Sequence, residues 1–127
     1  MTEVSAAVIK DISGRILICR RPEGKNCALL WEFPGGKREK GETAEQCLVR
    51  ECREELGVTV VVKDEIAEIS YDYPYGRIHL IFFSCYIKEG SAVSKEHAAL
   101  AWVRAADMGK YSFCPADSLV LKNITGE

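Results

Sequence analysis

The sequence predicts an α+β fold in which a mixed β-sheet packs against two main helices. Short runs rich in β-branched and aromatic residues, bounded by turn residues, predict the strands. Two longer segments carry helix-start signals, one in the middle of the chain and one near its end. This arrangement favours a sandwich of sheet and helices over a doubly wound parallel sheet.

The first part of the chain predicts a hairpin followed by a loop. Val4–Lys10 and Arg15–Arg20 are β-rich, and the turn signal Asp11-Ile12-Ser13-Gly14 separates them, so the two runs are expected to pair. Farther on come a polar loop at 22–28, a short strand at 31–33 and a stop at Pro34-Gly35-Gly36.

The segment Thr43–Leu56 carries the strongest helix signals. Thr43 can cap the first turn, and Gln46 three residues later completes a capping box. Gly57 supplies a left-handed stop. The remaining predicted elements are strands at 58–62, 66–71, 78–87 and 99–103, a turn at 72–77, and a final helix from Pro115 to about Ile124 with proline in its first turn.

The bulk properties suit one domain, residues 1–127, and disfavour several classes of function. The formal net charge is -2, whereas a sequence-independent grip on DNA or RNA needs a basic surface. No apolar run reaches the roughly 18 residues of a membrane span, and the N-terminus lacks the basic and apolar regions of a signal peptide. The six cysteines form no C-x-x-C pair, so reduced thiols in a cytoplasmic protein are expected. A zinc site using His79 or His97 is the alternative.

Three carboxylates are predicted to gather on one side of the 43–56 helix. Glu51, Glu54 and Glu55 fall within an arc of about 100°. Glu51 and Glu55 are one turn apart and repel each other, which is reasonable if a cation lies between them. The glycine turn before the helix can add a backbone carbonyl oxygen, and such hard oxygen ligands suit Mg²⁺. The neighbouring apolar row, expected to face the core, is Ala44, Leu48, Cys52 and Leu56.

Residues 36–58 resemble the Nudix box, the signature of a hydrolase family. The matching positions are Gly36, Glu42, Arg50, Glu51, Glu54, Glu55, Gly57 and Val58, with Cys52 where the family prefers a bulky aliphatic residue. The flanking segments that resemble the MutT-like branch are Arg20-Arg21-Pro22, 30–37, Lys95-Glu96-His97 before Trp102, and Pro115-Ala116-Asp117. That branch includes 8-oxo-dGTP diphosphatases and CTP pyrophosphohydrolases. The resemblance spans nearly the whole chain and implies an α/β/α sandwich.

The resemblance also implies an activity and a set of metal ligands. The implied reaction is Mg²⁺-dependent hydrolysis of a (deoxy)nucleoside triphosphate, such as CTP, dCTP or 8-oxo-dGTP, to a monophosphate and pyrophosphate, with Mn²⁺ as a second metal. Arg50 would hold the carboxylates in register, Glu42 would support this network, and either Glu51 or Glu96 would take a proton from water. The implied ligands are Glu51, Glu54, Glu55, Glu96 and the carbonyl of Gly35.

A second set of residues is expected to contact the nucleotide. Arg21 and Lys37 are candidates for phosphate contacts. Asp117, if ionised, only accepts hydrogen bonds, which favours a base with N–H donors such as cytosine; its place in a first helical turn also suits an acid. The candidate base-stacking walls, each equally suited to packing, are Phe33, Tyr73, Tyr75 and Phe113.

Two other functions stay open. Pro74 lies close to a proline of Nudix hydrolases that act on nucleoside diphosphate derivatives such as ADP-ribose. The other function is a catalytically silent nucleotide-sensing module. Loss of a box glutamate would indicate such a module, and all of these glutamates are present. The expected partner is a small nucleotide rather than a nucleic-acid polymer or a membrane, and the chain is expected to be a monomer or a homodimer.

Overall fold

Two β-sheets form the centre of the protein, whose structure is a computed structural model describing residues 1–125. The elements in chain order are β1 (Thr2–Ile9), β2 (Ile16–Arg20), β3 (Trp31–Glu32), β4 (Gly35–Lys37), α1 (Ala44–Leu56), β5 (Thr59–Tyr73), β6 (Gly76–Glu89), β7 (Ala99–Val103), the 3₁₀ helix η1 (Ala105–Lys110), α2 (Pro115–Leu119) and α3 (Leu121–Thr125). One sheet has the order β4–β1–β6–β5 and the other β3–β2–β7. β1 and β6 are parallel and the other pairs antiparallel, so the larger sheet is mixed.

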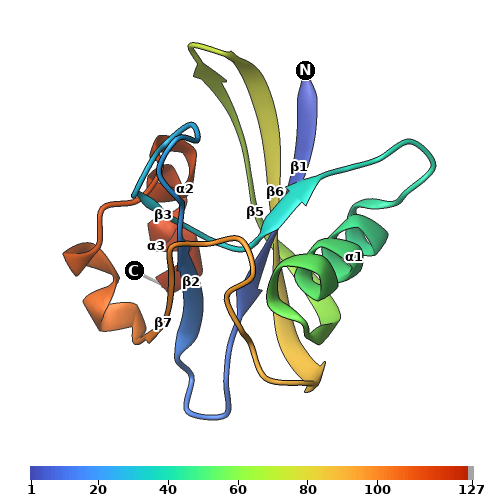
Figure 1. The fold of residues 1–127 in the computed structure, drawn as a ribbon, viewed down its shortest axis with the longest axis vertical. Coiled ribbons are helices and arrows are strands. Elements are labelled where there is room, and N and C mark those ends of the chain that lie inside the picture. Colours follow the sequence, from blue (N-terminus) through green and yellow to red (C-terminus); the bar gives the residue numbers. More distant parts are fainter. Residues whose placement is uncertain (126–127) are drawn as a thin grey trace.

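The helices lie on opposite sides of these sheets (Figure 1). The green helix α1 packs beside the four-stranded sheet, against β1, β4 and β5. The red helices α2 and α3 lie at the far side of the three-stranded sheet. The predicted α+β class with a mixed sheet is therefore confirmed.

β1 contributes side chains to two separate hydrophobic cores. Ala6 and Val8 pack into the core that includes the C-terminal helices, whereas Ala7 and Ile9 pack into the core beneath α1. All four side chains are almost completely buried. Successive residues of a strand point to opposite faces, so a strand covered on both faces is apolar without interruption.

The prediction that the first two strands form a hairpin is wrong. The chain does turn at 11–14, and an isolated bridge joins Lys10 to Ile16. Beyond that bridge β1 pairs with β4 and β6, while β2 pairs with β3 and β7. Because both strands are apolar on both faces, their sequences carry no pattern that distinguishes one sheet from two.

The helix α1 begins and ends as predicted. The Thr43 hydroxyl accepts from the backbone N–H of Gln46 at 3.1 Å, and the Gln46 side chain accepts from the backbone of Thr43 at 2.9 Å. Gly57 ends the helix with a φ of 71°. The predicted apolar row faces the core, with Leu48, Cys52 and Leu56 fully buried. The local signals were sufficient here.

Three other elements differ from the prediction. The strands expected at 58–62 and 66–71 are one strand, β5, whose pairing with β6 is irregular between Val62 and Ala67. The final helix is divided at Val120, whose φ of -106° and ψ of 5° leave the helical region while its side chain enters the core. The 3₁₀ helix η1 was not predicted. Within residues 1–125, no helix is both long and apolar enough to cross a membrane.

Candidate active site

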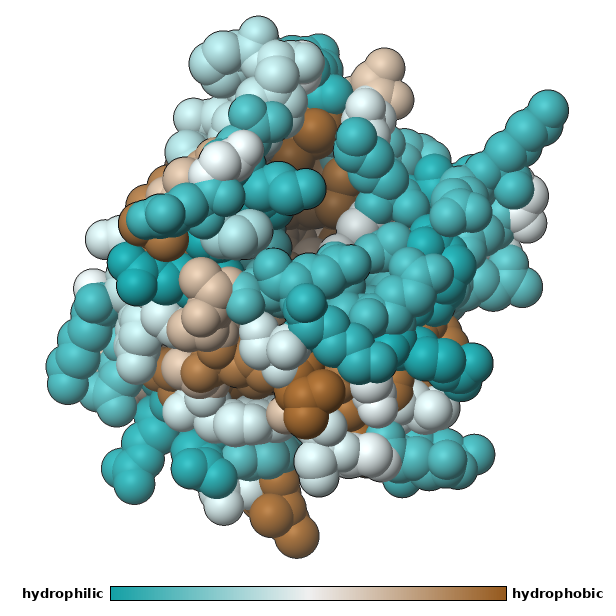
Figure 2. Space-filling model, viewed as in Figure 1, coloured by the Kyte–Doolittle hydropathy of each residue, from teal (hydrophilic) through white to brown (hydrophobic). Residues whose placement is uncertain are grey.

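A cavity of about 740 Å³ lies where the two sheets and α1 meet. Figure 2 shows this face of the molecule hollowed, with apolar side chains visible inside and hydrophilic residues around the opening. Its wall comes from 4–6, 21–22, 25–27, 32–33, 35–37, 51 and 55, 73, 75, 78 and 80, 96–97, and 114 and 117. The cavity therefore joins residues from every part of the chain.

The α1 wall of the cavity carries two carboxylates. The side chain of Glu51 is 17% exposed and that of Glu55 is 8% exposed. A side chain at Gly36 would collide with the carboxylate of Glu51, so the strand β4 can approach the helix only as glycine. A Cβ at Gly35 would likewise collide with the backbone of β1. Close packing thus requires Gly36 beside the carboxylate of Glu51 and Gly35 beside the backbone of β1.

Arg50 joins the acidic groups around α1, as predicted. Its guanidinium donates to Glu42 at 2.7 and 3.0 Å and to Glu51 at 2.7 Å. It also contacts Glu54 at 3.3 Å and the backbone carbonyl of Lys37 at 3.1 Å. The hydrogen bonds from Arg50 lower the pKa of Glu42 to about 2, because they stabilise its charged form.

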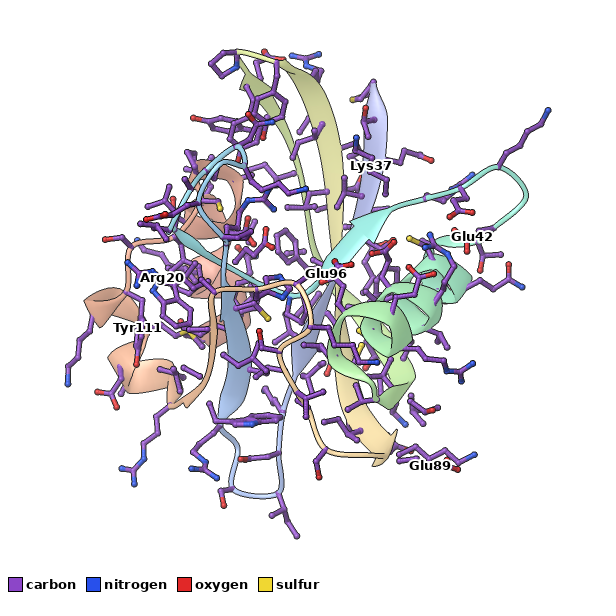
Figure 3. The ribbon with its side chains drawn as sticks, in the orientation of Figure 1. Arg20, Lys37, Glu42, Glu89, Glu96 and Tyr111 are labelled. Carbon is purple, nitrogen blue, oxygen red and sulfur yellow. The ribbon has the colours of Figure 1, made fainter. Side chains whose placement is uncertain are left out.

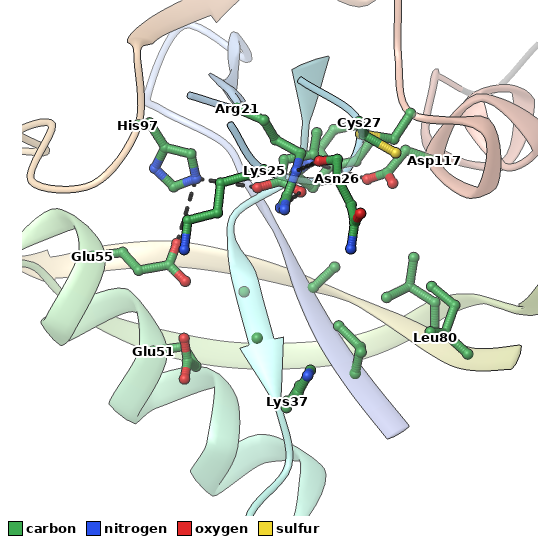
Figure 4. Close-up of a pocket in the computed structure, with 18 of the residues that line it drawn as sticks. Arg21, Lys25, Asn26, Cys27, Lys37, Glu51, Glu55, Leu80, His97 and Asp117 are labelled. Atoms are coloured by element: carbon green, nitrogen blue, oxygen red, sulfur yellow. Dashed lines mark hydrogen bonds and ion pairs between the residues drawn. The ribbon is translucent and has the colours of Figure 1, made fainter. Parts of the chain in front are cut away.

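Glu55 lies at the most enclosed part of this wall. Burial first, and then the neighbouring carboxylate of Glu51, raise the pKa of Glu55 well above its usual range. Its Oε2 lies 3.6 Å from Nε2 of His97, and the same nitrogen lies 3.2 Å from Oε2 of Glu32 (Figure 4). Glu32 and Glu55 thus approach the same imidazole nitrogen from β3 and from α1.

Glu96 reaches the cavity from the segment that precedes β7. Figure 3 shows Glu96 between α1 and the strands of the smaller sheet, with Lys37 on β4 and Glu42 before α1. The backbone N–H of Lys95 bonds the carbonyl of Glu55 at 3.3 Å, which fixes this segment to the end of α1. Glu96 therefore lines the same cavity as Glu51 and Glu55.

The cations of the cavity come from the loop after β2 and from β4. Arg21 donates to the carbonyl of Asn26 at 2.6 Å and to Glu32 at 3.1 Å. Lys25 and Lys37 also line the cavity (Figure 4). The loop backbone is strained, because Cys27 has a φ of 57° without being glycine. Such strain is common where a loop is shaped for a ligand.

Asp117 and two tyrosines also line the cavity, and Figure 4 shows Asp117 across the cavity from α1. Asp117 is 6% exposed, and its Oδ2 accepts from the backbone N–H of Phe33 at 3.1 Å. Burial first, and then the charge of Glu32, raise the pKa of Asp117 to about 8. This raised pKa favours the neutral acid, which both donates and accepts, over the ionised form assumed from the sequence. Tyr73 and Tyr75 stack at 5.0 Å.

The aromatic side chains divide into core and cavity residues. Phe33 is 3% exposed and stacks on Phe113 at 5.5 Å, so both rings belong to the core, although Phe33 also borders the cavity. The hydroxyl of Tyr73 accepts from the backbone N–H of Ala116 at 3.0 Å and supports α2. Tyr75 is 54% exposed and offers the most accessible ring of the set.

A family model described as NUDIX domain matches residues 5–123. The chain belongs to the NUDIX domain family. The CTP pyrophosphohydrolase of Escherichia coli (strain K12) is 38% identical over 122 residues, covering 96% of this chain and 90% of that protein. The 8-oxo-dGTP diphosphatase of the same organism is 32% identical over 122 residues, covering 96% and 95%. The solution structure of the E. coli ORF135 protein has a TM-score of 0.84 and 37% identity, covering 99% of this chain and 89% of that one.

The predicted Nudix ligands surround the cavity but do not form a closed metal cage. Gly35, Glu51, Glu55 and Glu96 line it, whereas Glu54 is 56% exposed and points to the outer face with Arg50. Within residues 1–125, no three His, Cys, Asp or Glu side chains are close enough to hold a metal by themselves. The donor set is all oxygen and strongly acidic, which fits Mg²⁺, an ion that keeps waters and phosphate oxygens among its ligands.

The contact of His97 with Glu32 and the presence of Lys25 and Asn26 in this Nudix site were not predicted. Glu32 and His97 are 65 positions apart in the sequence, so no local pattern indicates their contact. Lys25 and Asn26 were predicted only as part of a polar loop. Pro74 occupies the two-residue turn between β5 and β6, which explains a proline there without reference to substrate.

Proposed function

We propose that this chain hydrolyses a nucleoside triphosphate to a monophosphate and pyrophosphate. CTP or dCTP is the first candidate substrate and an oxidised deoxynucleotide such as 8-oxo-dGTP is the second, because proteins with these two activities by name are 38% and 32% identical to it. The observation that carries the proposal is one cavity lined by acidic, cationic and aromatic side chains. Its volume of about 740 Å³ suits a small ligand.

The two ends of the cavity match the two ends of a nucleotide. Asp117 offers a buried polar group for a base edge, and Tyr75 offers an exposed ring for stacking. Lys25 and Lys37 line the same cavity, where they can neutralise phosphate oxygens. Arg21 is already paired with Glu32, so it contributes to phosphate binding only by leaving or sharing that carboxylate.

Mg²⁺, or Mn²⁺ in its place, would be held by Glu51, Glu55 and Glu96 with the carbonyl of Gly35. Glu54, exposed on the outer face of α1, would have to turn toward the ion to join them. When bound, the ion neutralises phosphate charge and lowers the pKa of a water molecule. Glu51 or Glu96 accepts the proton as water attacks phosphorus, and the phosphoanhydride bond breaks to release pyrophosphate. Arg50 keeps Glu51 directed toward the cavity through their 2.7 Å contact.

We also propose that the protein is cytoplasmic. All six cysteines lie within the described residues and are free thiols, five of them buried. Reducing compartments keep thiols in this state. A second enzyme function, cleavage of ADP-ribose, has no structural observation in its favour, since the turn accounts for Pro74.

A substrate panel tests the proposal. The purified protein is incubated with Mg²⁺ and CTP, dCTP, UTP, 8-oxo-dGTP or ADP-ribose, and pyrophosphate and phosphate are measured separately. Pyrophosphate from CTP, dCTP or 8-oxo-dGTP is expected. Cleavage of ADP-ribose alone would place the chain in the nucleoside diphosphate branch, and a folded protein inactive on all five would indicate a sensing module.

A further inference from the structure

His97 is held rigidly in the wall of the cavity. Its side chain is only 5% exposed. The segment that carries it is fixed on both sides, because the backbone N–H of Lys95 bonds the carbonyl of Glu55 and that of Ala98 bonds the carbonyl of Arg20 at 2.8 Å. The imidazole is therefore placed between α1 and β2 by the backbone.

One nitrogen of His97 faces two carboxylates. Nε2 lies 3.2 Å from Oε2 of Glu32 and 3.6 Å from Oε2 of Glu55. The carboxylate of Glu32 offers only acceptors in its ionised form, so its 3.2 Å contact requires the N–H at Nε2, and the carboxyl oxygen of Glu55 is the second acceptor near that N–H. Nδ1 is buried and makes no hydrogen bond within the described residues. A single N–H therefore has two competing partners.

Glu32 connects His97 to the loop that borders the opposite wall. Its Oε1 accepts from Arg21 at 3.1 Å, while its Oε2 accepts from His97. Arg21 in turn holds the carbonyl of Asn26 at 2.6 Å. A continuous series of contacts thus runs from the loop, through Arg21, Glu32 and His97, to Glu55 on α1.

We propose that His97 is a positioning residue that couples nucleotide binding at the Arg21 side to divalent-cation binding at the Glu55 side; this rests on the proposed function. A cation that takes Glu55 leaves the Nε2 proton to Glu32 alone. Phosphate that draws Arg21 away from Glu32 leaves the Nε2–H of His97 as the remaining donor to that carboxylate. Each event therefore makes the other more favourable, and the effect is reciprocal.

The test measures binding rather than turnover. The dissociation constant of Mn²⁺ is determined by electron paramagnetic resonance with and without α,β-methylene CTP, which cannot be cleaved between the α and β phosphates. The amide nitrogen of His97→Gln falls close to the position of Nε2, whereas that of His97→Asn falls close to Nδ1. His79→Gln, a change at a histidine on β6 that pairs with Glu68 away from the cavity, is the matched control.

The nucleotide is expected to tighten Mn²⁺ binding in the wild type, His97→Gln and His79→Gln by similar factors. This factor is the dissociation constant of Mn²⁺ without the nucleotide divided by that with it. In His97→Asn it should fall by about tenfold, the effect of one hydrogen bond to a charged group. Calorimetric titration of the nucleotide with and without Mn²⁺ should give the same loss. Thermal unfolding of each variant shows whether it is folded.

Three results would overturn the proposal: an unchanged factor in His97→Asn, an equal loss in His97→Gln, or a wild-type factor near one. If His97→Asn does not fold, Glu32→Gln tests the link from the other side, and an unchanged factor in that variant also overturns it. A wild-type protein that neither binds Mn²⁺ nor releases pyrophosphate contradicts the proposed function itself.

Discussion

Replacement of Asp117 by asparagine should remove a pH-dependent loss of stability. Burial raises the pKa of Asp117 from its ordinary value of 3.8 to about 8 in the folded protein, so the folded state holds a proton that the unfolded state releases above pH 3.8. A raised pKa stabilises the fold fully below the unfolded value, and that stability is lost as pH rises to the folded value. The loss is about 1.4 kcal/mol per pH unit across this window.

The asparagine side chain cannot ionise, yet its oxygen can still accept from the backbone of Phe33. Relative to wild type, the free energy of unfolding of Asp117→Asn should therefore rise by about 4 kcal/mol between pH 5 and pH 8, three units at the rate above. For a domain of this size the melting temperatures should separate by on the order of 10 °C. Urea and thermal unfolding at pH 5, 6, 7 and 8 measure this. Parallel curves for the two proteins would refute the reasoning, and Asp107→Asn, a change at an exposed acid in η1, should show no such trend.

Three further predictions concern activity. Glu54→Gln should lower turnover by at least about 10²-fold, with little change in melting temperature because the side chain is exposed. Glu45→Gln on the same helix is the control and should leave turnover unchanged. Near wild-type turnover of Glu54→Gln would remove Glu54 from the site. Glu51→Gln should reduce kcat far more than Glu96→Gln if Glu51 takes the proton, and harmless substitutions at both positions would contradict the mechanism. The ratio of kcat/KM for CTP to that for UTP should increase between pH 7 and pH 9, because Asp117 ionises and then only accepts, which favours the N–H donors of cytosine. A pH-independent ratio equal to that of Asp117→Asn would show that this residue does not contact the base.

The features that the sequence predicted correctly are those whose causes lie within one turn of helix or one strand. The capping box of Thr43 and Gln46 and the stop at Gly57 are local, so α1 could be located to the residue. The strand irregularity near Val62 is not local, because it depends on which residues of β6 lie opposite. The same holds for the division of the last helix at Val120, which follows from the demands of the core.

The site shows the same division between local and long-range causes. Glu51 and Glu55 lie one turn apart on α1, so their proximity follows from helical geometry alone, whereas the outward direction of Glu54 does not. The other wall depends on pairs far apart in sequence, such as Glu32 with His97 and Phe33 with Asp117, the latter separated by 84 positions. The ionisation of Asp117 could not be inferred either, since it depends on burial by elements that the sequence does not place.

The wrong hairpin prediction and the presence of the cavity have one structural cause. After the turn at 11–14, β1 and β2 diverge into different sheets, and the chain must cross between the sheets again from β3 to β4. That crossing, residues 33–34, sets Glu32 in the smaller sheet and Gly35 in the larger one. Because β1 and β2 lie in different sheets, residues of both sheets border the space between them. The cavity is therefore a consequence of the separation of two strands that sequence pattern alone would pair, and the residues that line it are distributed along the chain because both sheets contribute.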